Sequence, residues 1–168
     1  MKDEQKIIRA NDNDEPAAEG GFLSMPGHLL RRCHQIGVAI FLDECRAYEL
    51  TPLQFGVLSA LDGFGPMDQA RLGGVTALDR TTTIVVLTKL EERGLVTRVP
   101  SKKDKRAKIV AITEAGRRTL ADILPSVAEV QRRILAPLNG RERSQLLSLL
   151  RKMAEGNNSL SRAPYKIP

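Results

Sequence analysis

Hydrophobic residues recur along this chain with a helical period in most segments and with a strand period in one. Apolar positions three and four residues apart predict a helix from Pro26 to about Tyr48. Thr51 followed by Pro52 predicts the start of a second helix, because threonine caps helix N-termini and proline suits the first helical position. The glycine- and proline-rich tract 62–66 predicts the end of that helix.

The central part of the chain predicts a short helix followed by a longer amphipathic one. The short helix is expected from Met67 to Leu72, with Gly73-Gly74 as its terminator. Asp79 is a suitable N-cap for the longer helix, which is expected from Arg80 to Arg93. One stripe at helical spacing would face the core: Thr83, Val86, Leu87 and Leu90.

The period changes after the helix that ends near Arg93. Two short β-branched segments, Leu95–Val99 and Lys108–Ile112, flank a basic turn and predict a β-hairpin with a charged tip. Thr113 then opens a long helix that contains Pro125 and should bend there. A last helix is expected at about Arg141–Glu155. The predicted fold is therefore mainly α with one small hairpin.

Composition places the chain among globular proteins of about one domain. Its 168 residues are 42% hydrophobic and 27% charged, and 26 Lys and Arg exceed 20 Asp and Glu for a net charge of +6. Because residues 1–20 hold six acidic and three basic side chains, the remainder carries +9, which favours a polyanionic partner. We expect residues 1–24 to be a disordered acidic tail and residues 156–168 to be a loose C-terminal tail.

Several classes of protein are disfavoured by the residue types and patterns that the chain lacks. Cys33 and Cys45 are its two cysteines, so no disulfide framework is implied and a cytoplasmic location is expected. No apolar run is long enough to span a membrane, and no signal-peptide pattern is present. Without a phosphate loop, a nucleophile motif or a metal-ligand spacing, we expect no enzyme activity, metal or cofactor.

Short helices followed by a basic hairpin describe a winged helix-turn-helix, flanked here by further helices at both ends. A helix of ten to fifteen residues fits the major groove of DNA, and its N-terminal half reaches the base edges. A hairpin tip rich in Lys and Arg suits phosphates or the adjacent minor groove. Double-stranded DNA is therefore the expected partner.

Five short blocks follow one another in a set order along the predicted helices and hairpin. They are Leu50–Phe55, Leu78–Thr82, Leu90–Val96, Asp104–Ala107 and Ile112–Gly116. In this order and spacing they resemble the MarR-type transcriptional regulators, over residues 25–155. The resemblance implies a homodimer, mostly a repressor, that often releases DNA on binding a small phenolic or aromatic anion. We assign 51–112 to the DNA-binding core, and 25–48 and 113–155 to dimerisation helices.

Helix geometry assigns roles along the segment 80–93. When the apolar stripe faces inward, the outward face holds the candidate DNA contacts Arg80, Thr81, Thr82, Ile84, Val85, Thr88 and Lys89. Thr81 and Thr82 would donate to phosphates or base edges, whereas Arg80 and Lys89 are expected to bind phosphates. Ile84 and Val85 either pack under a neighbour or contact thymine methyl groups, and the sequence leaves both interpretations open.

The hairpin tip is expected to supply the electrostatic contacts. Its cations are Lys102, Lys103, Lys105 and Arg106. By resemblance, Asp104 and Arg106 match the family's Asp-x-Arg corner, in which the aspartate orients the arginine through a charge-assisted pair and the arginine enters the minor groove. A homodimer would place two recognition helices roughly 34 Å apart, which predicts an inverted-repeat operator.

The expected signal is a small anionic effector. The candidate residues lie on about two turns of the first helix: His28, Arg31, Arg32 and His34. The two arginines suit a carboxylate or phosphate. This stretch resembles family members that sense aromatic acids or their coenzyme A thioesters. A solvated helix face with ordinary histidines is the alternative interpretation.

Two other functions stay open. Peroxide-sensing members of the family use a reactive cysteine hydrogen-bonded by two tyrosines, so Cys33 raises a redox alternative. Cys33, however, lies closer to the Leu50-Thr51 block than the reactive cysteine of those members does. The chain's two tyrosines are Tyr48 and Tyr165. An inert Cys33 is therefore favoured.

An architectural DNA binder without an effector is the second alternative. It would show no sequence preference beyond DNA shape, whereas a repressor would discriminate strongly against random DNA.

Overall fold

The structure, a computed structural model, describes residues 21–100 and 108–166. It divides into two compact units, residues 1–35 and 36–168. In the first unit, the 3-10 helix η1 (Gly21–Ser24) precedes the start of α1 (Pro26–Glu44). The second unit holds the end of α1 and a separate 3-10 turn, η2 (Arg46–Tyr48), so the first helix ends earlier than the sequence predicted.

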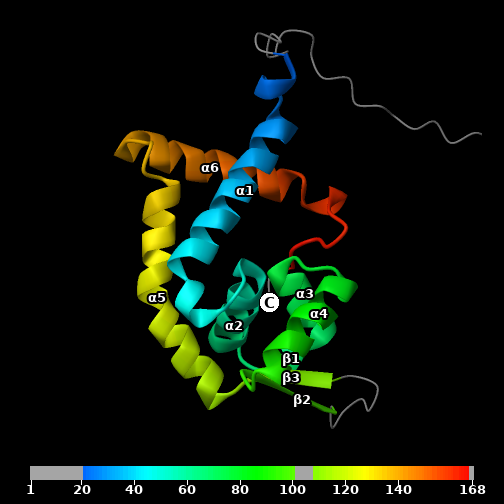
Figure 1. Ribbon diagram of the computed structural model, residues 1–168. Coiled ribbons are helices and arrows are strands. Elements are labelled where there is room, and N and C mark those ends of the chain that lie inside the picture. The colour runs from blue at the N-terminus through cyan, green and yellow to red at the C-terminus, as the bar shows by residue number, and fades with distance from the viewer. Residues whose placement is uncertain (1–20, 101–107, 167–168) are drawn as a thin grey trace, which may run out of the picture. The chain divides into compact units, whose positions relative to one another are not determined.

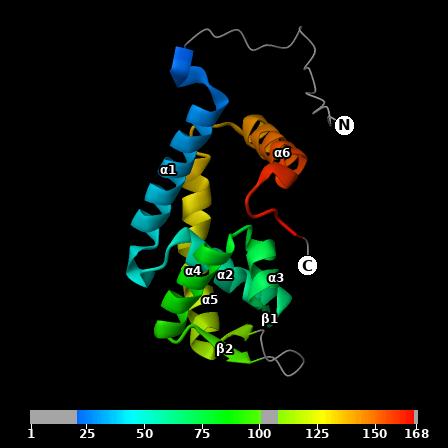
Figure 2. The ribbon, with the colours of Figure 1, turned by 90° about the vertical axis from the view of Figure 1, so that its right-hand side faces the viewer.

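The remaining helices all lie in the second unit (Figures 1 and 2). They are α2 (Pro52–Phe64), α3 (Gln69–Thr76), α4 (Arg80–Glu92), α5 (Glu114–Ile134), α6 (Gly140–Gly156) and the 3-10 helix η3 (Asn158–Leu160). The predicted helix starts at Thr51, Asp79 and Thr113 are confirmed: each side chain accepts a bond from a backbone N–H in the first turn, and Asn139 caps α6 in the same way. Within the described ranges, no helix has the length and hydrophobicity needed to cross a membrane.

A three-stranded antiparallel sheet follows the order β1-β3-β2. Strands β2 (Val96–Pro100) and β3 (Lys108–Ile112) form the predicted hairpin. The third strand, β1 (Met67–Asp68), corrects the sequence prediction, which placed these two residues in a helix. Met67 is buried, and β1 pairs with β3, so a contact with a segment distant in sequence determines its conformation.

The glycine pair in α3 serves packing rather than termination, which is a second correction. Helix α3 continues through Gly73-Gly74 to Thr76 and ends on Ala77, whose φ of 52° is left-handed. A Cβ on Gly73 would lie 2.9 Å from the carbonyl oxygen of Leu78 and 3.1 Å from Oγ1 of Thr83. Glycine is therefore required where α3 approaches the start of α4.

The hydrophobic core of the second unit surrounds α2. Val57, Leu58 and Leu61 of α2 have no solvent exposure, and residues from α4, β3 and α5 enclose them. The members of these elements with no solvent exposure are Leu87, Leu90, Val110 and Ile123. Helix α6 contributes none, because no residue of α6 is buried. The core thus fixes the winged helix-turn-helix elements and leaves α6 outside it.

Candidate nucleic-acid interface

The first turn of α4 is held by Asp79. Its carboxylate accepts the backbone N–H of Thr82 at 2.8 Å and the hydroxyl of Thr82 at 3.1 Å. These two bonds lower the pKa of Asp79, the backbone bond most of all, with smaller contributions that include the positive charge of Arg162. Thr82 is therefore engaged in capping, and Thr81 is the exposed hydroxyl of this turn.

Helix α4 presents the two faces that the sequence predicted. Thr83, Val86, Leu87 and Leu90 are buried, and Thr83 Oγ1 donates to the carbonyl of Asp79 at 2.8 Å. Five of the candidate DNA contacts are exposed and two are half-buried. The exposed ones are Arg80, Thr81, Ile84, Val85 and Lys89; the half-buried ones are Thr82 and Thr88. Ile84 and Val85 retain 42% and 50% exposure, so no neighbouring segment among the described residues covers them.

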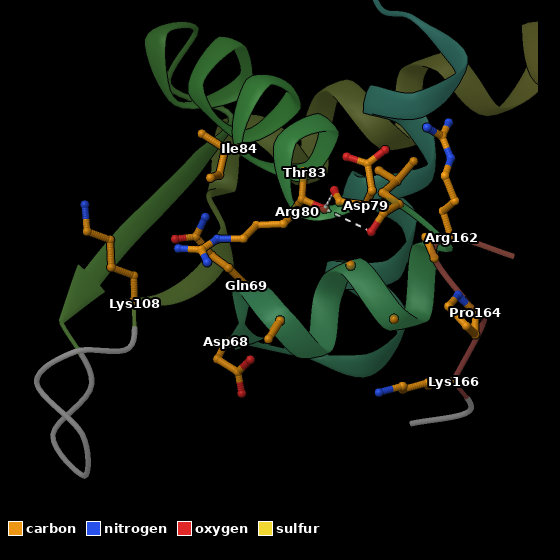
Figure 3. A pocket seen from close by; sticks show the side chains of 15 residues that line it. Asp68, Gln69, Asp79, Arg80, Thr83, Ile84, Lys108, Arg162, Pro164 and Lys166 are labelled. Carbon is orange, nitrogen blue, oxygen red and sulfur yellow. Dashed lines mark hydrogen bonds between the residues drawn. The ribbon is translucent and has the colours of Figure 1, made fainter. Parts of the chain in front are cut away.

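A pocket of about 540 Å³ lies beside the start of α4 (Figure 3). Its lining brings Arg80 and Ile84 of α4 together with Gln69 at the start of α3 and Lys108 of β3. Figure 3 shows Arg80 extending toward Gln69. Sequence reasoning did not select Gln69 or Lys108, although Lys108 belongs to the basic cluster of the hairpin.

The root of the wing is anchored to α4. Arg98 of β2 forms an ion pair with Glu91 of α4, with Arg98 Nε donating to Glu91 Oε2 at 2.8 Å. The hydrogen bond from Arg98 lowers the pKa of Glu91 although desolvation opposes it. The predicted wing-tip contacts Lys102, Lys103, Asp104, Lys105 and Arg106 lie outside the described residues.

The opposite end of α4 is tied to the neighbouring helices. The guanidinium group of Arg93 donates to the backbone carbonyls of Glu49 at 2.7 Å and Tyr48 at 2.8 Å. The Tyr48 hydroxyl in turn donates to the carbonyl of Asp122 in α5 at 2.6 Å. Three segments distant in sequence are thereby joined: the end of α4, the link between α1 and α2, and α5.

The candidate effector residues all lie in the first unit, on α1. Arg31, Arg32 and His34 are exposed, whereas His28 is half-buried and its ring lies tilted against that of Phe22, with 4.4 Å between the centroids. Arg31 donates to Oε1 of Gln35 at 2.7 Å. At 3.6 residues per turn, His28, Arg31 and Arg32 share one face, while His34 lies nearly opposite Arg32. The helix thus presents a cationic face with two arginines.

The two cysteines have different surroundings. Cys33 is exposed. Cys45 is 1% exposed, and its burial raises the pKa of the thiol, with a smaller contribution from Glu44. A raised thiol pKa disfavours the reactive thiolate, so Cys45 is unsuited to redox sensing at neutral pH.

Comparison with known proteins identifies the family. A sequence model of the MarR family matches residues 48–107. The HTH-type transcriptional repressor NicR of Pseudomonas putida is 37% identical over 133 residues, which cover 79% of this chain and 84% of NicR. The chain belongs to the MarR family. MarR proteins are transcriptional regulators, so the predictions of a DNA-binding transcriptional regulator and of no enzyme activity are confirmed.

Solved MarR-type structures confirm the predicted winged helix-turn-helix. BpsR of Bordetella bronchiseptica, whose DNA binding is regulated by 6-hydroxynicotinic acid, is 34% identical with a TM-score of 0.75; the match covers 79% of this chain and 95% of BpsR. The repressor CouR, solved on a 23-mer DNA duplex, is 32% identical with a TM-score of 0.75; the match covers 80% of this chain and 96% of CouR.

Proposed function

We propose that this MarR-family chain is a repressor that binds an inverted-repeat operator as a homodimer and leaves it when a small aromatic anion binds. The observation that carries the proposal is the outward face of α4, where apolar and hydroxyl side chains are exposed beside cations. Its 13 residues extend over about 20 Å, a length that fits a major groove. Contact with a partner would explain why the apolar side chains of Ile84 and Val85 are exposed on this face.

A second copy of the chain is the proposed partner of α6. This helix has no buried residue, yet it exposes large apolar side chains on 38% to 55% of their surface: Leu147, Leu149, Leu150 and Met153. An uncovered apolar face of this kind is typical of a subunit interface. Pairing of two copies would set two α4 helices roughly 34 Å apart and require a two-fold symmetric operator. Sedimentation equilibrium should give twice the mass of the chain.

The proposed effector is an aromatic carboxylate or its coenzyme A thioester, bound near Arg31 and Arg32. Two guanidinium groups on one face of α1 suit a carboxylate or phosphate. The regulation of the relative BpsR by 6-hydroxynicotinic acid supports an aromatic acid. A regulator of this kind acts where the chromosome is, so we place it in the cytoplasm.

The test is fluorescence anisotropy with the duplex upstream of the chain's own coding sequence and a random duplex of equal length. We expect binding to the upstream duplex to be at least about a thousand-fold tighter, as in specific protein–DNA complexes. Equal affinity for both duplexes would instead support an architectural DNA binder.

The effector is tested in the same assay with 6-hydroxynicotinate, benzoate and benzoyl coenzyme A. Release of DNA by one of these probes should be lost in Arg31→Gln or Arg32→Gln and kept in Arg46→Gln, which removes an equal charge after α1 has ended. Peroxide is added in a separate titration to test the redox alternative. If peroxide releases the wild type but not Cys33→Ser, and no aromatic probe has an effect, the aromatic-anion proposal is wrong.

A further inference from the structure

The chain after α6 returns to the helix-turn-helix instead of forming the loose tail expected from the sequence. Figure 2 shows it running from the end of α6 to α3. The backbone N–H of Lys166 donates to the carbonyl of Gly74 in α3 at 2.9 Å. A Cβ on Gly74 would lie only 3.2 Å from Cβ of Lys166, so the two backbones are in close contact. We call residues 157–166 the C-terminal arm.

Asn158 holds the conformation of the C-terminal arm. Its amide donates to the carbonyl of Tyr165 at 3.0 Å, and its Oδ1 accepts the backbone N–H of Tyr165 at 2.8 Å. Ser161 Oγ accepts the backbone N–H of Ala163 at 3.1 Å within the loop. One side chain therefore satisfies both backbone groups of a residue seven positions away and closes the arm into a defined loop.

The C-terminal arm brings two cations to the pocket beside α4. Arg162 and Lys166 line it from one edge, while Lys108 at the tip end of β3 lines the other (Figure 3). Arg162 lies beside Asp79 in Figure 3, and neither arm cation forms an ion pair with a carboxylate in the part of the chain that the structure describes.

The two acids that line the pocket offset only part of the positive charge around it. Asp68 and Asp79 cap α3 and α4, and each accepts a backbone N–H at 2.8 Å. Asp79 also attracts Arg162, and with two acids against four cations the pocket lining keeps a formal charge of +2. Four cations remain around the pocket: Arg80, Lys108, Arg162 and Lys166.

We propose that the C-terminal arm is part of the DNA interface and that Arg162 and Lys166 bind backbone phosphates on the side of α4 away from the wing. This inference rests on the proposed function, because it needs α4 to lie in a duplex groove. A groove has a phosphate backbone on each side, and strand β3 of the wing and the arm place cations at the two edges of one pocket. Phosphate contacts carry no sequence information, so the arm adds affinity for any duplex and leaves specificity unchanged.

The salt dependence of binding tests the arm directly. Each phosphate contact contributes about 0.9 to the slope of log K against log salt concentration. The double variant Arg162→Gln with Lys166→Gln should therefore have a slope shallower by about 2, with roughly ten- to hundred-fold weaker binding near 0.1 M salt. The loss should be equal on the upstream and the random duplex.

The matched control is Arg46→Gln with Arg118→Gln, which removes the same charge from exposed residues that do not line the pocket. A second variant, Asn158→Ala, keeps both arm cations and removes the bonds that position them. It should also weaken binding, with an unchanged circular dichroism spectrum to show that the fold is intact.

The outcomes separate the two proposals. If the wild type binds neither duplex, the proposed function is wrong. If the wild type binds but the double variant keeps its affinity and slope, or matches the control, the arm does not contact DNA. Tighter binding of DNA by the double variant would also overturn the inference, because it would mean that the arm inhibits DNA binding.

Discussion

Arg98 and Glu91 form an ion pair that joins strand β2 of the wing to helix α4. Arg98 lies on β2 and its side chain is only 15% exposed, whereas Glu91 lies in the last turn of α4. The pair leaves little freedom at the root of the hairpin. The predicted wing-tip contacts would therefore project from a base that is fixed relative to α4.

This pair should stabilise the fold at neutral pH and lose its effect in acid. Arg98 lowers the pKa of Glu91 in the folded state, so the contribution is present above the ordinary pKa of glutamate and disappears as the pH falls below about 4. Glu91→Gln should lower the free energy of unfolding at pH 7 by about 0.5–1 kcal/mol, a small value because the carboxylate is partly exposed. Urea titrations should show the difference shrinking toward pH 3; a difference independent of pH would contradict this.

Ile84→Ala and Val85→Ala should separate DNA contact from packing. Both side chains are exposed, so we expect changes in unfolding free energy within about 0.5 kcal/mol. If they contact thymine methyl groups, affinity for the operator should fall by about 1–2 kcal/mol while affinity for random DNA is kept. Val86→Ala is the packing control, since Val86 is buried and its truncation should cost stability first. Unchanged operator affinity in both exposed variants would remove them from the interface.

Arg106→Ala should weaken operator binding by about 1–3 kcal/mol, as expected for an arginine that enters a groove. Arg106 lies outside the described residues, so its role stays a prediction from the sequence. The measurement is the dissociation constant at matched salt, beside Asp104→Asn, which should reproduce part of the loss if the aspartate orients the arginine. An Arg106→Ala variant with wild-type affinity would exclude the role.

Gly116→Ala should destabilise the junction between the hairpin and α5. An added Cβ would overlap the carbonyl of Leu95 and lie 2.7 Å from Cγ1 of Ile112, so the junction would have to open. We expect a loss of about 1–3 kcal/mol in the free energy of unfolding. Gly63→Ala is the matched control: it lies in α2 with open space around it and should gain about 0.5–1 kcal/mol from helix propensity. Equal effects of the two substitutions would refute the steric argument.

Local signals predicted α4 well. An aspartate cap and a stripe of four inward residues are properties of one short segment, and the structure confirms both. The burial of Thr83 was predicted by the same spacing. Helix geometry therefore also placed the exposed candidate contacts correctly, although their binding to DNA stays a prediction.

Contacts between segments distant in sequence explain where prediction failed. Met67 and Asp68 form a strand only because β3 lies beside them. Gly73 looked like a terminator, yet its missing side chain is needed for the approach of Leu78 and Thr83. The C-terminal arm is held by hydrogen bonds to Asn158 and Gly74, and no periodic pattern in the sequence predicts such bonds. Each case depends on a neighbour that the local sequence does not reveal.

The bonds of Arg93 and Tyr48 have a mechanical consequence. Because they connect the end of α4 to α5 through the link between α1 and α2, a tilt of α5 would be transmitted to α4. A change at α5 would thus reach α4 without unfolding either helix. If two α4 helices bind two half-sites as proposed, such a coupled motion would alter the fit at each of them.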